Sequence, residues 1–250
     1  MRHIVTLFVL LFAGTAAADD ARTIEDIIAR HTEARGGAGV IEAVQSVRVA
    51  LEITEPGFTV TGDYVATREG FMRIDIYADG TRVFTEALGP DGGWQMMADG
   101  SVKGLTPEGL DALRRGLEGN LYGLHERAAL GYRYRLVGKT EQGGRPVYEL
   151  EEVASDGFSK HLFVDAETYQ VIADVRTAAL HPDVDSTEKR QMTFYSVFEA
   201  AAGGPLYSTV SQTRDMDTGE NMQRVRITAR TLNPEIDPAV FKRPEAGAGE

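Results

Sequence analysis

The strongest constraint on this chain is a hydrophobic pattern with a period of two, which begins at Ser46 and returns in segment after segment. In the first segment apolar residues alternate with Arg48, Ala50 and Glu52, so one face of the strand is apolar and the other polar. Turn-forming pairs such as Asp79-Gly80 stand in the gaps, and short turns make neighbouring strands antiparallel. Strands are predicted at residues 46–53, 58–67, 71–77, 82–88, 94–97, 132–141, 147–153, 160–165, 171–177, 189–198, 206–214 and 222–232.

Two amphipathic helices accompany these strands. Thr23 can cap the first, with Asp26 three residues on, and Gly36-Gly37 ends it. The second begins at Thr106 and continues loosely to Leu124. Its apolar stripe consists of Leu110, Leu113 and Leu117. The simplest fold that accommodates these elements is mainly β with two or three helices. It is a single strongly curved antiparallel sheet, or unclosed β-barrel, and the helices cover its concave face as a lid.

Residues 1–18 carry, in order, the features of a secretory signal peptide. Arg2 and His3 form a basic start, residues 4–12 are apolar apart from Thr6, and Ala18 ends a run of small residues suited to cleavage. A membrane anchor is the less favoured alternative, since spanning a bilayer takes about 20 apolar residues. We therefore expect a signal peptide at residues 1–18, one folded domain at residues 19–243 and a disordered tail at residues 244–250.

Composition narrows the choice of partners. The chain is 42% hydrophobic and 26% charged, as is typical of a globular domain. Its formal charge of −12 becomes −13 once Arg2 leaves with the signal peptide, so we expect no nucleic acid partner and no stable membrane insertion. Because the chain has no cysteine, it carries neither a disulfide nor a lipid-modified cysteine at the predicted cleavage site.

No known catalytic or metal-binding motif is present, so we expect neither an enzyme nor a cofactor or metal. The five histidines are too scattered to form a helical metal pair. Residues 215–220 partly resemble a calcium-binding loop. A complete loop needs ligands spread over twelve residues, which this stretch does not have, so a polar hairpin turn is favoured. The acidic residues Asp183, Asp185 and Glu188 beside Pro182 are interpreted as a solvated loop.

Short motifs spread over nearly the whole mature chain resemble those of a known family. Each motif is weak evidence by itself, but their order and spacing together are fairly specific. They are Ile27-Ile28-Ala29-Arg30, Ala34-Arg35-Gly36-Gly37, Ala43-Val44-Gln45-Ser46-Val47, Arg68, Phe71-Met72-Arg73, Pro90-Asp91-Gly92-Gly93-Trp94, residues 143–150, residues 163–169, Leu232-Asn233-Pro234 and Phe241-Lys242-Arg243-Pro244. In these features the chain resembles the outer-membrane lipoprotein carrier superfamily (LolA/LolB-like), in particular its lipoprotein-sorting branch.

The resemblance implies an incomplete barrel whose apolar cavity accepts the acyl chains of a lipoprotein or another lipid. In the soluble carriers an arginine after the second strand helps to hold the lid shut, and Arg68 corresponds to it. This chain has Glu69-Gly70 where the carriers usually have a proline next, so a surface pair between Arg68 and Glu69 or another neighbour is the alternative.

The other candidate ligand-binding residues come from the same comparison. Trp94 follows an Asp-Gly turn as an aromatic residue does in the family, and a core tryptophan is the alternative. Phe71 lies in a matching motif. The lid stripe of Leu110, Leu113 and Leu117 either touches ligand or fills the core.

The leading hypothesis is a periplasmic carrier or chaperone that moves acylated cargo between membranes. It would act as a monomer and meet an envelope protein that donates or accepts the cargo. The alternative is a periplasmic regulatory module that senses acylated ligands or a protein partner without catalysis.

Overall fold

The structure is a computed structural model that describes residues 22–245. The predicted signal peptide at residues 1–18 lies outside the described residues, as does the predicted tail beyond Glu245.

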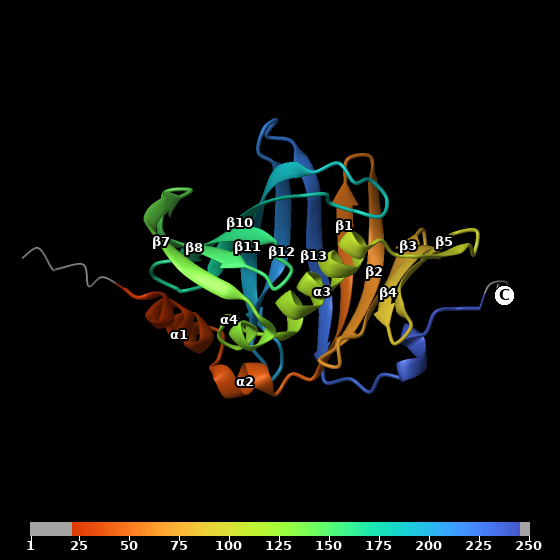
Figure 1. Cartoon of the computed structure of the whole chain (residues 1–250), viewed down its shortest axis with the longest axis horizontal. Coiled ribbons are helices and arrows are strands. Elements are labelled where there is room, and N and C mark those ends of the chain that lie inside the picture. The colour runs from red at the N-terminus through yellow and green to blue at the C-terminus, as the bar shows by residue number, and fades with distance from the viewer. Residues whose placement is uncertain (1–21, 246–250) are drawn as a thin grey trace, which may run out of the picture.

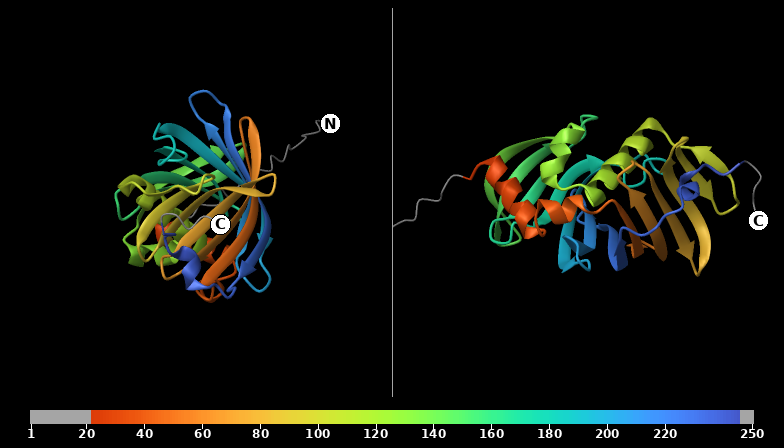
Figure 2. Two further views of the ribbon diagram at one scale, coloured as in Figure 1. Left: turned by 90° about the vertical axis from the view of Figure 1, so that its right-hand side faces the viewer. Right: turned by 90° about the horizontal axis from the view of Figure 1, so that it is seen from below.

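One antiparallel sheet dominates the described part of the chain. Its thirteen strands run in the order β6-β5-β4-β3-β2-β1-β13-β12-β11-β10-β9-β8-β7, so β6 and β7 form the two free edges and the sheet does not close. The predicted unclosed barrel is therefore confirmed (Figures 1 and 2). The strands are β1 (Ser46–Glu55), β2 (Phe58–Thr67), β3 (Met72–Ala78), β4 (Thr81–Gly89), β5 (Gly92–Met97), β6 (Val102–Gly104), β7 (Arg133–Gln142), β8 (Arg145–Val153), β9 (Ser159–Asp165), β10 (Val171–Ala178), β11 (Lys189–Ala200), β12 (Leu206–Asp215) and β13 (Asn221–Leu232).

Four α-helices and two short 3₁₀ turns accompany the sheet in the described part of the chain. They are α1 (Ile24–Ala34), α2 (Ala38–Glu42), α3 (Pro107–Leu121) and α4 (Leu124–Arg127), with short 3₁₀ turns at Ala128–Leu130 and Pro238–Phe241. The capping box between Thr23 and Asp26 is present. The predicted continuation to Leu124 is wrong as one helix, because Tyr122 adopts an extended conformation (φ −107°, ψ 139°) that separates α3 from α4.

Two apolar clusters cover the concave face. Helix α3 crosses in front of β13, β1 and β2 in Figure 1, and the first cluster joins it to these strands and to β3 and β4. Helices α1 and α4 join β8 and β9 in the second, which contains Ile27, Leu124 and Leu150. The first consists of Val44, Val47, Val49, Leu51, Tyr64, Ala66, Met72, Leu88, Leu117 and Leu121, with Ile53, Ile74, Leu110, Leu113, Tyr122, Val225, Ile227 and Leu232 packed against them.

Candidate functional site

The concave face of strands β1 to β5 is an apolar surface that α3 covers. Strand register shows which side chains share this face: Val47 lies opposite Ala66, which continues to Met72 and Leu88 across β3 and β4. Gly93 on β5 completes the row, and a Cβ there would collide with Leu110 of α3. Glycine at this position therefore leaves room for the leucine side chains between helix and sheet.

The three lid leucines lie together on this face, as the helical spacing predicts. Leu117 is buried in the first apolar cluster, and Leu110 and Leu113 pack against it partly buried. The concave face thus carries a continuous apolar surface, and the leucines of α3 occupy it.

Arg68 follows the end of β2, and its one guanidinium connects α2, α3 and α4 as well as the segment before β1. Its Nε donates to the carbonyl of Val44 at 2.7 Å. Its Nη2 donates to the carbonyls of Ile41 at 3.1 Å and Leu121 at 3.0 Å, and its Nη1 lies 2.6 Å from Oε1 of Glu126. Because Leu121 is the last residue of α3, the cation lies where the helix dipole favours positive charge.

The partner of Arg68 is Glu126 rather than Glu69, so the predicted alternative of a surface pair with Glu69 is wrong. Both side chains of the Arg68–Glu126 pair are largely buried, with 15% and 14% of their surface exposed. Burial alone would raise the pKa of Glu126, but hydrogen bonds from Arg68 and from the backbone N–H of Gly123 hold that pKa below its usual value. The ring of Tyr122 lies 4.4 Å from the guanidinium carbon of Arg68.

Asp183 holds the opposite end of α3. It belongs to the loop between β10 and β11, and its Oδ1 accepts a hydrogen bond from the backbone N–H of Thr106, the N-cap residue, at 2.8 Å. A Cβ at Gly109 would collide with its carboxylate. The prediction of a purely solvated loop is therefore wrong for Asp183. Its negative charge faces the positive end of the helix dipole.

A third contact ties the middle of α3 to the turn between β8 and β9. Arg115 forms an ion pair with Asp156, and its guanidinium carbon lies 4.1 Å from the ring centroid of Phe158. A small polar hollow of about 210 Å³ lies beside this pair and is lined in part by Arg114 and Glu118. Helix α3 is thus held by charged side chains at both ends and at its centre.

Trp94 and Phe71 do not join the leucines. Trp94 lies opposite Ala87 in the register of β4 and β5, on the convex face, and it is 1% exposed. The C-terminal segment covers it: Trp94 Nε1 donates to the carbonyl of Phe241 at 3.1 Å, and the ring of Phe71 lies 5.7 Å from that of Phe241. Both are corrections to the expected placement beside the lid leucines. Trp94 follows Gly93 along β5, and Phe71 directly precedes Met72, so each side chain lies on the other side of the sheet from a neighbour that faces α3.

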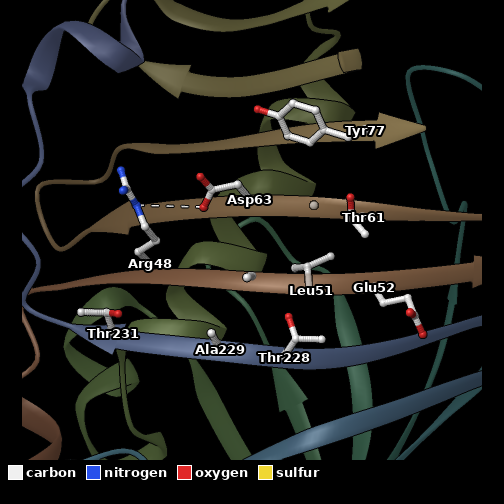
Figure 3. A pocket seen from close by; sticks show the side chains of 11 residues that line it. Arg48, Leu51, Glu52, Thr61, Asp63, Tyr77, Thr228, Ala229 and Thr231 are labelled. Carbon is white, nitrogen blue, oxygen red and sulfur yellow. Dashed lines mark ion pairs between the residues drawn. The ribbon is translucent and has the colours of Figure 1, made fainter. Parts of the chain in front are cut away.

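The convex face also carries a hollow of about 500 Å³, shown in Figure 3. Polar side chains of β1, β2 and β13 line it, and Arg48 lies 4.0 Å from Asp63 across it. Tyr77 borders the same hollow from β3. These residues lie on the opposite face of the sheet from the lid leucines, so the hollow does not correspond to the apolar cavity implied by the resemblance.

Charged and polar side chains separate the two apolar clusters on the concave face. Arg127 of α4 pairs with Glu152 of β8 at 3.0 Å, and Lys160 pairs with the same carboxylate. On β10, Asp174 pairs with Arg176 at 2.7 Å. Glu152 is buried, yet Lys160 and Arg127 hold its pKa below the usual range against the effect of burial.

Sequence reasoning missed Glu126 and Asp183 as partners of the lid. No local pattern marks either: Glu126 lies in a single helical turn, and Asp183 reaches α3 from a loop more than seventy residues away in sequence. Within residues 22–245, no group of three or more potential ligand side chains could hold a metal ion. Over the same range, none of the helices has the length and apolar character needed to cross a bilayer.

Comparison with known proteins identifies the fold. No protein family model matches the sequence, and no curated protein matches it either. Among solved structures, a domain named for outer membrane lipoprotein sorting from Vibrio parahaemolyticus superposes with a TM-score of 0.58 at 11% identity, covering 86% of this chain and 94% of that one. A LolA superfamily protein from Nitrosomonas europaea gives a TM-score of 0.58 at 14% identity, covering 89% and 99%.

A third neighbour, a DUF1329 family protein from Desulfovibrio piger, gives a TM-score of 0.57 at 13% identity over 88% of this chain and 97% of that one. These identities are too low to transfer a residue's role, but the superpositions extend over almost the whole of each neighbour. The chain therefore has a LolA/LolB-like fold.

Proposed function

We propose that this protein is a periplasmic carrier that binds the acyl chains of lipoproteins or other lipids on the concave face of its sheet. The observation that carries the proposal is the apolar surface on β1 to β4 and β13, which a single helix covers with its leucine stripe. In the loaded state α3 moves away from this surface and an acyl chain takes the place of Leu110, Leu113 and Leu117.

Competition between the lid and the ligand gives such a carrier a moderate affinity. Burying one methylene group contributes about 0.8 kcal/mol, so complete burial of a long acyl chain on a permanently open surface would exceed 10 kcal/mol and hinder release. Here the ligand must displace leucines that already bury the same surface, and only the difference between the two states remains as binding free energy.

The charged contacts of α3 raise the cost of opening. Arg68 and Asp183 hold the two ends of the helix, and Arg115 holds its centre. A hydrogen bond that involves a charged group contributes about 1.5–3 kcal/mol when shielded from water, and less when exposed. Together they favour the closed state without making it permanent, which is what loading and unloading by transient envelope partners requires.

The direct test is to purify the protein from the periplasm under gentle conditions and identify bound lipids by native mass spectrometry. Titration with a fluorescent fatty acid then measures the affinity of the emptied protein. We expect bound acyl chains in the first measurement and saturable binding in the second. A protein that is isolated empty and also fails to bind added acyl chains would contradict the proposal.

A transfer assay separates the carrier from the regulatory alternative. Loaded protein is mixed with acceptor vesicles or with an acceptor protein, and movement of the labelled chain is followed. A carrier releases its ligand to the acceptor. Retention of the ligand together with stable binding to a protein partner would instead favour a sensor.

A further inference from the structure

Two arginines share one aromatic ring on the concave side of the sheet. The guanidinium carbon of Arg230 on β13 lies 3.9 Å from the ring centroid of Tyr207 on β12, and that of Arg35 lies 5.2 Å from the same centroid. The two carbons are therefore within about 9 Å of each other. Arg230 lies opposite Val49 in the register of β13 and β1, which places it on the face that α3 covers.

The backbone fixes Arg35 at this position. Arg35 is the C-cap residue of α1, and its carbonyl accepts a hydrogen bond from the N–H of Leu206 at 2.9 Å, next to Tyr207. Its Nε in turn donates to the carbonyl of Leu206 at 3.3 Å. The end of α1 and the start of β12, which lie side by side in Figures 1 and 2, thus bring the two arginines together.

Neither arginine forms an ion pair with any carboxylate in the described part of the chain. Three other arginines of the concave side do: Arg68 pairs with Glu126, Arg127 with Glu152 and Arg176 with Asp174. Cations removed from water are usually paired, because desolvation without a partner is costly.

The electrostatics of the pair agree with this geometry. Burial lowers the pKa of Arg35 to about 10, and burial also lowers the pKa of Arg230. Both side chains nevertheless keep part of their surface exposed, so a ligand can reach them. In a chain with a formal charge of −12, this is a local excess of positive charge. Glu126 attracts Arg35 from beyond ion-pair distance, but its carboxylate is already paired with Arg68.

The chemistry of a matching ligand follows from these neighbours. Planar guanidinium groups donate paired hydrogen bonds to carboxylate or phosphate oxygens. Immediately beside Arg230, Val49 and Leu232 belong to the apolar cluster that α3 covers. A molecule with one oxyanionic head and one hydrocarbon chain would contact both parts.

We propose that Arg35 and Arg230, stacked on Tyr207, bind the oxyanionic head of an amphiphile whose chain lies on the apolar surface beneath α3. This inference rests on the proposed carrier function and specifies its ligand class: a carboxylate or phosphate head is preferred over an uncharged one.

The test compares three probes on purified protein by isothermal titration calorimetry, below the micelle concentration of each. Dodecyl phosphate carries chain and charge, dodecyl maltoside carries the chain alone, and inorganic phosphate carries the charge alone. The variants are Arg230→Gln and Arg35→Gln. Arg226→Gln is the matched control, because Arg226 lies on the same strand, pairs with Glu52 on the convex side and carries the same charge.

We expect Arg230→Gln and Arg35→Gln each to weaken dodecyl phosphate binding at least tenfold and to change dodecyl maltoside binding less than twofold. Arg226→Gln should alter neither, and Arg230→Lys should recover part of the loss. Thermal unfolding of each variant shows whether it is folded, and Arg230→Gln alone decides the matter if Arg35→Gln is unstable.

Other results overturn the inference in distinguishable ways. Equal losses for dodecyl phosphate and dodecyl maltoside would mean that the arginines only support the fold. An equal loss in Arg226→Gln would indicate general charge attraction. Inorganic phosphate that binds as tightly as dodecyl phosphate would make this a free-anion site. If dodecyl maltoside binds and dodecyl phosphate binds no better, only the anion site fails; if neither amphiphile binds, the carrier function fails as well.

Discussion

The guanidinium of Arg68 donates to the carboxylate of Glu126 across 2.6 Å, and the same guanidinium reaches the last carbonyl of α3 at Leu121. One side chain therefore joins the β2–β3 turn to α2, α3 and α4. The pair stabilises the closed arrangement, so it opposes any ligand that must displace α3.

Replacing Arg68 with leucine should make the protein less stable and its ligand binding tighter. Loss of the guanidinium leaves Glu126 and the carbonyl of Leu121 without their partner, which should lower the free energy of unfolding by about 2–3 kcal/mol. The same loss destabilises the closed state, so affinity for a fluorescent fatty acid should rise at least tenfold. Chemical denaturation and fluorescence titration measure the two effects.

Arg48→Leu is the matched control for this variant, since Arg48 is exposed on the convex face and lies 4.0 Å from Asp63. It should change stability by less than about 0.5 kcal/mol and leave affinity unchanged. If Arg68→Leu binds fatty acid no more tightly than Arg48→Leu, then Arg68 does not hold the lid.

Replacing Asp183 with asparagine should loosen the beginning of α3. The amide can still accept from the N–H of Thr106, but the charge that faces the helix dipole is lost, at a cost of about 0.5–1 kcal/mol. Hydrogen exchange across residues 107–121 should become faster. Asp185→Asn in the same loop is the control, because the Asp185 carboxylate accepts only from the N–H of Thr187 among the hydrogen bonds described. Equal hydrogen-exchange rates across residues 107–121 in both variants would show that Asp183 does not hold α3.

The C-terminal segment should stabilise the convex face without affecting ligand. Phe241 is 2% exposed and covers Trp94, the single tryptophan of the chain. Phe241→Ala should cost about 3–4 kcal/mol and shift tryptophan emission to longer wavelength, whereas Phe58→Ala, at a half-exposed phenylalanine, should do neither. Adding fatty acid to the native protein should leave the emission unchanged. A strong response to fatty acid would place Trp94 in the binding site after all.

Stability should fall as the pH drops from 6.5 toward 4. Burial, followed by the charge of Arg35, lowers the pKa of His31 from 6.5 to about 4, so in this window the unfolded chain binds a proton that the folded protein does not. The free energy of unfolding should decrease by up to about 3 kcal/mol across the window. Urea denaturation at several pH values measures it. In His31→Gln the slope between about pH 6.5 and 5.5 should be nearly absent, since carboxylates with a lowered pKa, such as Glu126 and Glu152, add to the slope only at lower pH. An unchanged slope in that upper window would assign it to other groups.

The strand pattern of this fold was predictable because it is local. Alternation along β1 and β2 places their ends within two residues of those expected, and the turn at Asp79-Gly80 is where the sequence predicts it. The same is true of the leucine stripe of α3, which the structure places on the concave face. Strand β6, with three residues, is too short to show a period.

The side of the sheet on which each aromatic side chain lies was less predictable. A motif at residues 90–94 marks Trp94, but which side of the sheet it faces depends on register with β4, and its cover comes from Phe241. Similarly, Arg35 and Arg230 are almost two hundred residues apart, and no local pattern links either to Tyr207. Contacts between distant segments depend on the complete sheet order, which one sequence does not contain.

The most direct test of the account is to lock α3 in place. The chain has no cysteine, and a Cβ at Gly109 would lie 2.7 Å from Cγ of Asp183, so the side chains of Gly109→Cys and Asp183→Cys would meet and can be joined by oxidation. Fatty-acid binding is measured for the oxidised and reduced double variant, with each single variant as control. We predict that the oxidised form does not bind and that reduction restores binding at least as tight as in the native protein. Equal affinity in the oxidised and reduced forms would contradict the claim that α3 must move to admit an acyl chain.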